Sequence, residues 1–122
     1  MREARVVIDM SGEAFYWGQP DGRTSASLPD DHDFWVVLWD NRHKLSGVAH
    51  SHPSGMTVPS GIDLTTFAAI EAGLGRQLDW WILAGDILIH THWIGPGRLS
   101  YESLPVEQRP SWVERLQEAS RI

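Results

Sequence analysis

Two histidines and an aspartate have the types and spacing of a metal-binding group. His50 ends an apolar run, LSGVAH, and His52 and Asp63 follow it. Residues two apart on a strand point to the same side, so both imidazoles are expected to converge on one point. Zinc accepts neutral imidazole nitrogens and a carboxylate oxygen, and a catalytic zinc keeps one further position for water. The three residues are therefore candidate ligands of a zinc ion.

The segment after the histidines, PSGMTVPSG, is suited to return the chain to a metal, because its prolines stiffen it and its glycines permit sharp bends. A simpler interpretation is also open, in which Ser60 caps a helix and Asp63 is an acidic residue of its first turn. A second His-x-His pair, His90 and His92, has no such loop and acid after it. We interpret that second pair as structural.

The complete string HSHPSGMTVPSGID spells His-x-His-Pro, six residues, Ser, two residues, Asp. It resembles the signature of the JAMM (MPN+) metalloprotease family, and it is also similar to the motif of bacterial RadC proteins of the same superfamily. The match covers fourteen residues. The resemblance implies one zinc ion per chain on His50, His52 and Asp63. It further implies that the Ser60 hydroxyl helps to stabilise an oxyanion.

The same family requires a glutamate upstream as the general base, and only Glu3 and Glu13 precede the histidines. Glu13 opens EAFYWG, which resembles the family's glutamate-bearing strand that ends in glycine. Glu3 lies in a terminus that is expected to fray. We therefore predict Glu13 as the base. Family members often have glycine and leucines after this glutamate, whereas aromatic residues follow here, and a solvated carboxylate at a strand edge is the alternative for Glu13.

The elements that must position these residues can be read from the pattern of apolar residues and turns. Strands are expected over residues 4–10, 13–18, 34–39 and 44–50, the last two as a hairpin. A helix over 62–74, two strands meeting at 84–86 and a helix from Ser111 are expected to follow, and the last helix is expected to carry Trp112, Val113 and Leu116 inward. The fold class is therefore α+β, a sheet with packed helices. The resemblance implies a single MPN/JAB-like domain with a mixed central sheet, layered as in cytidine deaminases.

Length and composition limit the number of domains, the partners and the kinds of metal site that the protein can have. Residues 1–122 have the size of one domain, and neither a cleavable leader nor a long apolar segment is apparent, so we expect a cytoplasmic protein with no membrane partner. The absence of cysteine excludes a thiolate zinc site and the cysteine-bearing site of nucleoside deaminases. A net charge of −6 with scattered basic residues argues against nucleic acid as a partner.

The resemblance implies a JAMM-type zinc metallopeptidase or isopeptidase, in which a zinc-activated water and a glutamate base hydrolyse a peptide or isopeptide bond. Eukaryotic deubiquitinating members have long insertions that grip ubiquitin, and this chain has no room for them. The expected substrate is therefore the C-terminal tail of a ubiquitin-like or sulfur-carrier protein, or another short peptide. Two alternatives stay open, namely a catalytically silent MPN-type scaffold and a RadC-like protein associated with DNA repair.

Overall fold

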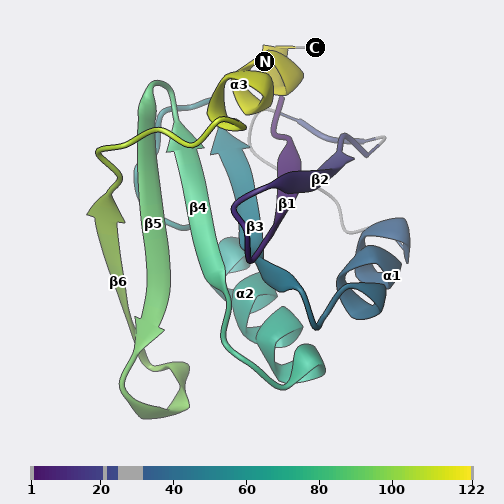
Figure 1. The fold of residues 1–122 in the computed structure, drawn as a ribbon. Helices are drawn as coiled ribbons and strands as arrows, with labels where there is room; N and C mark the ends of the chain where they lie inside the picture. The colour runs from purple at the N-terminus through teal and green to yellow at the C-terminus, as the bar shows by residue number, and fades with distance from the viewer. Residues whose placement is uncertain (1, 21, 25–31, 122) are drawn as a thin grey trace.

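The computed structural model describes residues 2–20, 22–24 and 32–121 (Figure 1). These residues form six strands, three α-helices and one short 3-10 helix, so the expected α+β class is confirmed. In chain order the elements are β1 (Arg5–Asp9), β2 (Ala14–Gly18), α1 (His32–Asp40), β3 (Leu45–His52), α2 (Gly61–Leu74), β4 (Asp79–Ala84), β5 (Ile87–Ile94), η1 (Pro96–Arg98), β6 (Ser100–Pro105) and α3 (Val113–Arg121).

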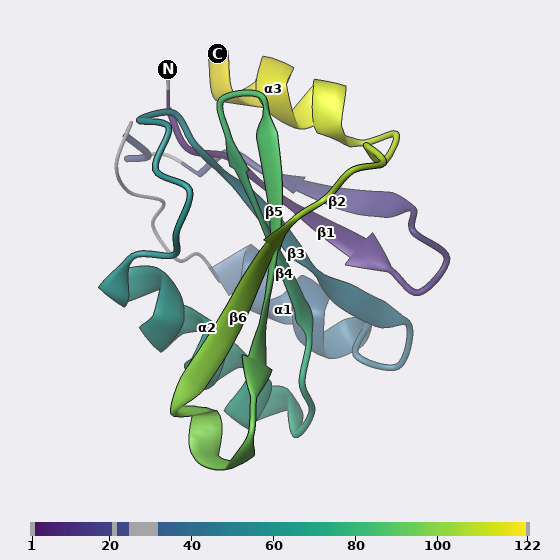
Figure 2. The ribbon, with the colours of Figure 1, turned by 90° about the vertical axis from the view of Figure 1, so that its left-hand side faces the viewer.

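The six strands form one mixed sheet in the order β2-β1-β3-β4-β5-β6. β3 and β4 are parallel and are connected through α2, whereas β1 pairs with β2 and β3, and β5 with β4 and β6, in antiparallel fashion. Helices α1 and α2 lie on one face of the sheet, and α3 lies on the other face near the end of β3 (Figures 1 and 2). The sheet is thus the middle one of three layers.

The layer beneath α1 and α2 is rich in aromatic residues. Phe67 of α2 stacks on Trp80 of β4 with ring centroids 4.1 Å apart. Val48 of β3 belongs to the same buried cluster. Since strand residues alternate between faces, His50 and His52 point to this side too. The consequence is that the histidines face the helix that carries Asp63.

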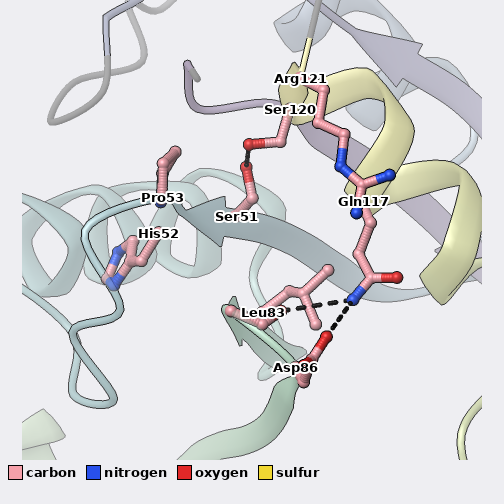
Figure 3. A pocket seen from close by; sticks show the side chains of 9 residues that line it. Ser51, His52, Pro53, Leu83, Asp86, Gln117, Ser120 and Arg121 are labelled. Carbon is pink, nitrogen blue, oxygen red and sulfur yellow. Dashed lines mark hydrogen bonds between the residues drawn. The ribbon is translucent and has the colours of Figure 1, made fainter.

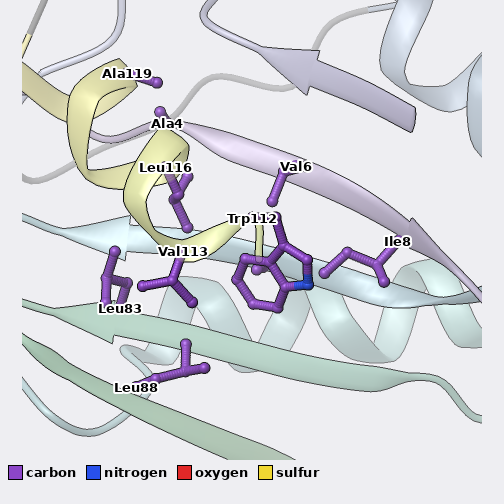
Figure 4. Packing of buried hydrophobic residues seen from close by; sticks show 10 residues of the cluster. Ala4, Val6, Ile8, Leu83, Leu88, Trp112, Val113, Leu116 and Ala119 are labelled. Atoms are coloured by element: carbon purple, nitrogen blue, oxygen red, sulfur yellow. The ribbon is translucent and has the colours of Figure 1, made fainter. Parts of the chain in front are cut away.

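The opposite face packs against α3 (Figure 4). Trp112, Val113 and Leu116 were expected to point inward, and they are 4%, 0% and 0% exposed. They contact apolar residues of the central strands, including Val6 and Leu83. The helix itself begins at Val113, two residues after the predicted start. Its amphipathic pattern was therefore sufficient to identify its buried side.

The segment FWVVLW is a helix, and its prediction as a buried strand is wrong. It forms most of α1, in which Phe34 and Leu38 are buried while Trp39 is 52% exposed. Phe34 and Leu38 are four residues apart, which is the spacing of one helix face. Six consecutive apolar residues concealed this period, because the exposed side of the helix is apolar as well. The expected hairpin between residues 34–39 and 44–50 is consequently wrong also.

Two other predictions of secondary structure, the second helix and the strand pair after it, are confirmed. Helix α2 covers the expected residues and ends at Leu74, and the φ of 72° at Gly75 gives a left-handed cap. Strands β4 and β5 form the expected antiparallel pair around residues 84–87. β6 was not predicted, and it extends the sheet beyond β5. No helix within the described part of the chain is long and apolar enough to cross a bilayer.

A buried carboxylate joins α2 to the sheet. Glu71 is fully buried, and its Oε2 accepts hydrogen bonds from the Leu78 N–H at 3.0 Å and the Trp80 Nε1–H at 2.8 Å. Its Oε1 accepts a bond from Arg98 Nε at 2.9 Å. A buried charge is tolerated when it is paired and hydrogen-bonded in this way. The network fixes the course of the chain between α2 and β4.

Candidate metal centre

The two histidines occupy the end of the central strand β3. Because β3 lies between β1 and β4, its backbone is hydrogen-bonded on both sides. His50 and His52 are each 6% exposed, and their Nε2 atoms lie 2.9 Å apart. The ring of His50 also packs edge-on against Phe67, with centroids 6.0 Å apart. The expectation that residues two apart would aim at one point is met.

Asp63 is brought to the histidines by the start of α2. Its Oδ1 lies 3.3 Å from His50 Nε2, and its Oδ2 lies 3.0 Å from His52 Nε2. Asp63 also completes a capping box, since its Oδ2 accepts a bond from the Ser60 N–H at 2.8 Å. The helix cap and the convergence with the histidines therefore occur together. The cap orients the carboxylate rather than withdrawing it.

Hydrogen bonding determines which nitrogen of His52 carries a proton. His52 Nδ1 lies 2.9 Å from the Met56 carbonyl oxygen, which can only accept, so Nδ1 is the donor. In the neutral ring, Nε2 then presents a lone pair toward His50 and Asp63. Burial disfavours the charged ring, but hydrogen bonds to Asp63 and Met56 outweigh it, and the pKa of His52 is raised. The arrangement therefore favours positive charge between these groups.

The carboxyl group of Asp63 responds to the same neighbours. Burial alone would raise its pKa, but hydrogen bonds from His50 and His52 hold the pKa of Asp63 well below its usual range. Asp63 is thus an anion at neutral pH, with both oxygens directed at imidazole nitrogens. An anion and lone pairs that face one another are stabilised by a proton or a cation between them.

The donor set and its spacing fit a zinc ion. Tetrahedral zinc with bonds of about 2.0–2.1 Å holds its ligand atoms about 3.3 Å apart. His50 Nε2 and His52 Nε2 lie 2.9 Å apart, and they lie 3.3 and 3.0 Å from Asp63 Oδ1 and Oδ2, respectively. Two imidazoles and a carboxylate are also a ligand set found in catalytic zinc sites, with a further position open. The three residues are therefore suited to hold zinc.

A second carboxylate, Glu3, lies beside the histidines. One of its oxygens and a ring nitrogen each of His50 and His52 lie within 4.8 Å of one another. Glu3 is 5% exposed, and burial raises its pKa to about 7, with a smaller opposing contribution from His52. A carboxyl group that titrates near neutral pH is suited to accept a proton and to return it.

The predicted base, Glu13, lies elsewhere, and this prediction is corrected. Glu13 is exposed in the turn between β1 and β2, where its N–H donates to Asp9 Oδ1 at 3.1 Å. β1 and β3 are antiparallel, so Arg5 pairs with His50, whereas Asp9 pairs with Leu45. A span of five strand residues corresponds to about 17 Å. Glu13 is therefore at the far end of β1 from the histidines.

Glu3 was set aside because its segment was expected to fray, but this segment is held by the rest of the fold. The N–H of Glu3 donates to the Thr24 carbonyl at 2.7 Å, and the N–H of Ser51 donates to the Ala4 carbonyl at 2.9 Å. Because β1 pairs with β3 in antiparallel fashion, the beginning of β1 lies beside the end of β3. The order of strands in the sheet was the missing information, and no local pattern contains it.

Ser60 lies at the N-cap of α2, one turn before Asp63. Its Oγ accepts a bond from the Asp63 N–H at 3.0 Å, and a hydroxyl that accepts a bond still carries its own proton.

A cavity of about 180 Å³ adjoins His52 between the ends of β3 and β4 and helix α3 (Figure 3). Leu83, Gln117 and Arg121 are among the residues that line it. Ser51 and Ser120 line it as well as Leu83, so it lies on the α3 side of the sheet, whereas the imidazoles point to the α2 side.

The second His-x-His pair has an acidic neighbour that the sequence did not indicate. His90 Nε2 lies 2.8 Å from Asp79 Oδ1 of the adjacent strand, and the rings of His90 and His92 stack at 5.3 Å. The histidine holds the pKa of Asp79 below its usual value. These contacts join β4 to β5, and the interpretation of the pair as structural stays a prediction.

Comparison with known proteins leaves the geometry as the main guide to function. No protein-family model matches the chain, and no curated protein is significantly similar to it. A function must therefore be argued from the fourteen-residue motif and the side chains around it.

Proposed function

We propose that this protein is a zinc-dependent hydrolase of the JAMM type, with an MPN/JAB-like fold, that cleaves a peptide or isopeptide bond. The observation that carries the proposal is the convergence of His50, His52 and Asp63, whose nitrogen and oxygen atoms are 2.9 to 3.3 Å apart. The buried carboxyl group of Glu3 next to them supplies the second component that such a hydrolase needs. The place of Glu3 does not follow from the motif spacing, because it depends on the pairing of β1 with β3.

Each residue has a role that its contacts support. His50 and His52 would bind zinc through Nε2, with His52 held in the required tautomer by its bond to the Met56 carbonyl. Asp63 would be the anionic ligand. When bound, zinc would polarise a substrate carbonyl and lower the pKa of a water molecule.

Glu3, rather than Glu13, is proposed as the general base. Its carboxylate would accept a proton from the attacking water and donate it to the leaving amine. The Ser60 hydroxyl would donate a hydrogen bond to the oxyanion that develops on the carbonyl oxygen, and loss of one such donor costs about 10²–10³ in rate. Glu3 lies two residues before β1 and Ser60 is the N-cap of α2, so the two groups would act from different segments of the chain.

The proposed substrate is the C-terminal tail of a ubiquitin-like or sulfur-carrier protein. An extended tail of this kind could add as a strand to a sheet edge, and β2 and β6 are the edge strands. We further propose that the protein acts in the cytoplasm.

The experiment is a hydrolysis assay on ubiquitin-like proteins fused through their C-termini to a reporter, as linear and as isopeptide conjugates. We expect cleavage that a chelator abolishes and zinc restores. Glu3→Gln should keep zinc and lose about 10²–10⁴ in turnover. Glu13→Gln is the matched control and should keep both. Cleavage that withstands chelation, or undiminished turnover of Glu3→Gln, would contradict the proposal, and zinc binding without any cleavage would favour the scaffold alternative.

A further inference from the structure

The main chain around Glu3 is held by hydrogen bonds to distant parts of the sequence. The N–H of Glu3 donates to the Thr24 carbonyl at 2.7 Å. Arg23, which is 7% exposed, donates from Nη1 to the Glu3 carbonyl at 3.2 Å and to the Ala119 carbonyl at 3.0 Å. Both backbone groups of Glu3 are therefore occupied, and one guanidinium joins Glu3 to the end of α3.

Two buried serines hold the residues on either side of Glu3. Ser51 Oγ accepts a bond from the Ala4 N–H at 3.0 Å and donates to Ser120 Oγ at 3.2 Å (Figure 3). Ser120 Oγ in turn donates to the Arg2 carbonyl at 2.8 Å. Both serines are 3% exposed. Each hydroxyl thus accepts one bond and donates another, in a chain that runs from Ala4 to Arg2.

This chain of bonds connects Glu3 to the metal ligands. Ser51 lies between His50 and His52 in β3, with its side chain on the opposite face of the strand. The pairing register of β1 with β3 begins at Arg5, so residues 2–4 precede the ladder of that strand. Backbone bonds to the Thr24 carbonyl and from the Ser51 N–H still hold Glu3 and Ala4, and the hydroxyl and guanidinium groups add to them. A buried network with satisfied donors and acceptors rigidifies the groups that it joins.

We propose that Ser51, Ser120 and Arg23 are positioning residues that fix the carboxyl group of Glu3 relative to His50 and His52. We refer to these three side chains as the Glu3 clamp. The proposal rests on the proposed function, because it matters for turnover only if Glu3 moves the proton. The bonds of the clamp reach Glu3 itself and both of its neighbours, which is the arrangement that sets the direction of one side chain. A displacement of about 1 Å in such a group can cost about 10²-fold in rate.

The first test uses metal-free protein and needs no substrate. Ser120→Ala removes two bonds of the clamp without touching Glu3. Its matched control is Ser103→Ala, which removes a hydroxyl pair with Thr91 between β5 and β6. We expect the amide of Ala4 to exchange with solvent at least about tenfold faster in Ser120→Ala and at the wild-type rate in Ser103→Ala, by NMR. Unchanged protection of Ala4 in Ser120→Ala would overturn the proposal.

The second test separates positioning from stability. With zinc bound, Ser120→Ala should lower kcat about 10- to 100-fold on a peptide that ends in Gly-Gly and carries a fluorogenic amide, while KM and zinc content change less than about twofold. Ser120→Thr keeps the hydroxyl and should recover most of kcat. In the Glu3→Gln background, Ser120→Ala should lower kcat no further, because the group that it positions is absent.

Two results would refute positioning while leaving the proposed function intact. One is wild-type kcat in zinc-loaded Ser120→Ala, and the other is an equal loss of kcat on top of Glu3→Gln. A wild-type protein that hydrolyses neither this peptide nor the fusion proteins would instead refute the proposed function. The exchange of the Ala4 amide would then still decide whether the clamp orders Glu3.

Discussion

Replacing Glu3 by glutamine should stabilise the metal-free protein at pH 8 and not at pH 4. Burial raises the pKa of Glu3 from 4.5 to about 7. In the unfolded chain this carboxyl ionises as the pH passes 4.5, whereas in the folded protein it ionises only near 7. The wild-type protein therefore loses stability over this interval as the pH rises. Glutamine does not ionise, so Glu3→Gln avoids the loss.

The size of this effect follows from the same difference in pKa. At about 1.4 kcal/mol per pKa unit, a rise from 4.5 to about 7 corresponds to about 3 kcal/mol. The free energy of unfolding of wild type minus that of Glu3→Gln should therefore fall by about 3 kcal/mol between pH 4 and pH 8. Asp63 and His52 titrate in both proteins, so their contributions largely cancel in this difference.

Urea unfolding of metal-free protein at pH 4, 6 and 8 measures this difference. Glu13→Gln is the control, because its side chain is exposed and such substitutions usually change stability by less than about 0.5 kcal/mol. We expect the control to follow the wild type at every pH. A difference between wild type and Glu3→Gln that does not vary with pH would refute the reasoning, because the carboxylate would then be solvated in the folded protein.

Three further predictions concern the metal and the scaffold. Free zinc at about one hundred times its dissociation constant should raise the free energy of unfolding by about 2.7 kcal/mol, and Asp63→Ala should abolish that increase in a thermal or urea titration. Glu71→Ala leaves the donors of a buried carboxylate unpaired and should destabilise the protein by about 3–5 kcal/mol in urea, whereas a loss below about 1 kcal/mol would mean that water replaces the carboxylate. Gly47→Ala would put a Cβ 1.9 Å from the Asp79 carbonyl oxygen and should cost roughly 1–3 kcal/mol by forcing β3 and β4 apart. Wild-type stability of Gly47→Ala would show that these strands separate easily.

Local sequence patterns were sufficient for the residues that lie on one strand or one helix turn. The histidines of β3 share a face because strand residues alternate, and Asp63 is oriented by a cap that its spacing from Ser60 already indicated. The motif therefore contained the ligand geometry. The same is true of α3, whose apolar residues recur at helical spacing.

Features that depend on the order of strands could not be predicted in this way. Glu3 and Glu13 were both available upstream, and the choice between them depends on which end of β1 lies beside His50. That choice is made by the antiparallel pairing of β1 with β3, which leaves no local mark in either segment. The hydrogen bonds that hold Glu3 come from Arg23 and Thr24 and from the far end of the chain.

The segment that forms α1 was wrongly predicted as a strand, and the reason is different. Val36 is 39% exposed and Trp39 is 52% exposed, so the outer side of the helix is apolar. An apolar run of six residues has no visible period, and β-branched and aromatic residues then favour a strand. Burial of Phe34 and Leu38 against the sheet decided the structure. Packing outweighed local propensity at this position.

X-ray absorption at the zinc edge of purified, zinc-loaded protein tests the central claim most directly. We predict one tightly bound zinc per chain with two imidazole ligands and nitrogen and oxygen distances of about 2.0–2.2 Å, and loss of this signal in His50→Ala and in Asp63→Ala. A wild-type protein that binds no zinc, or a spectrum that is the same in wild type and in both variants, would contradict the account.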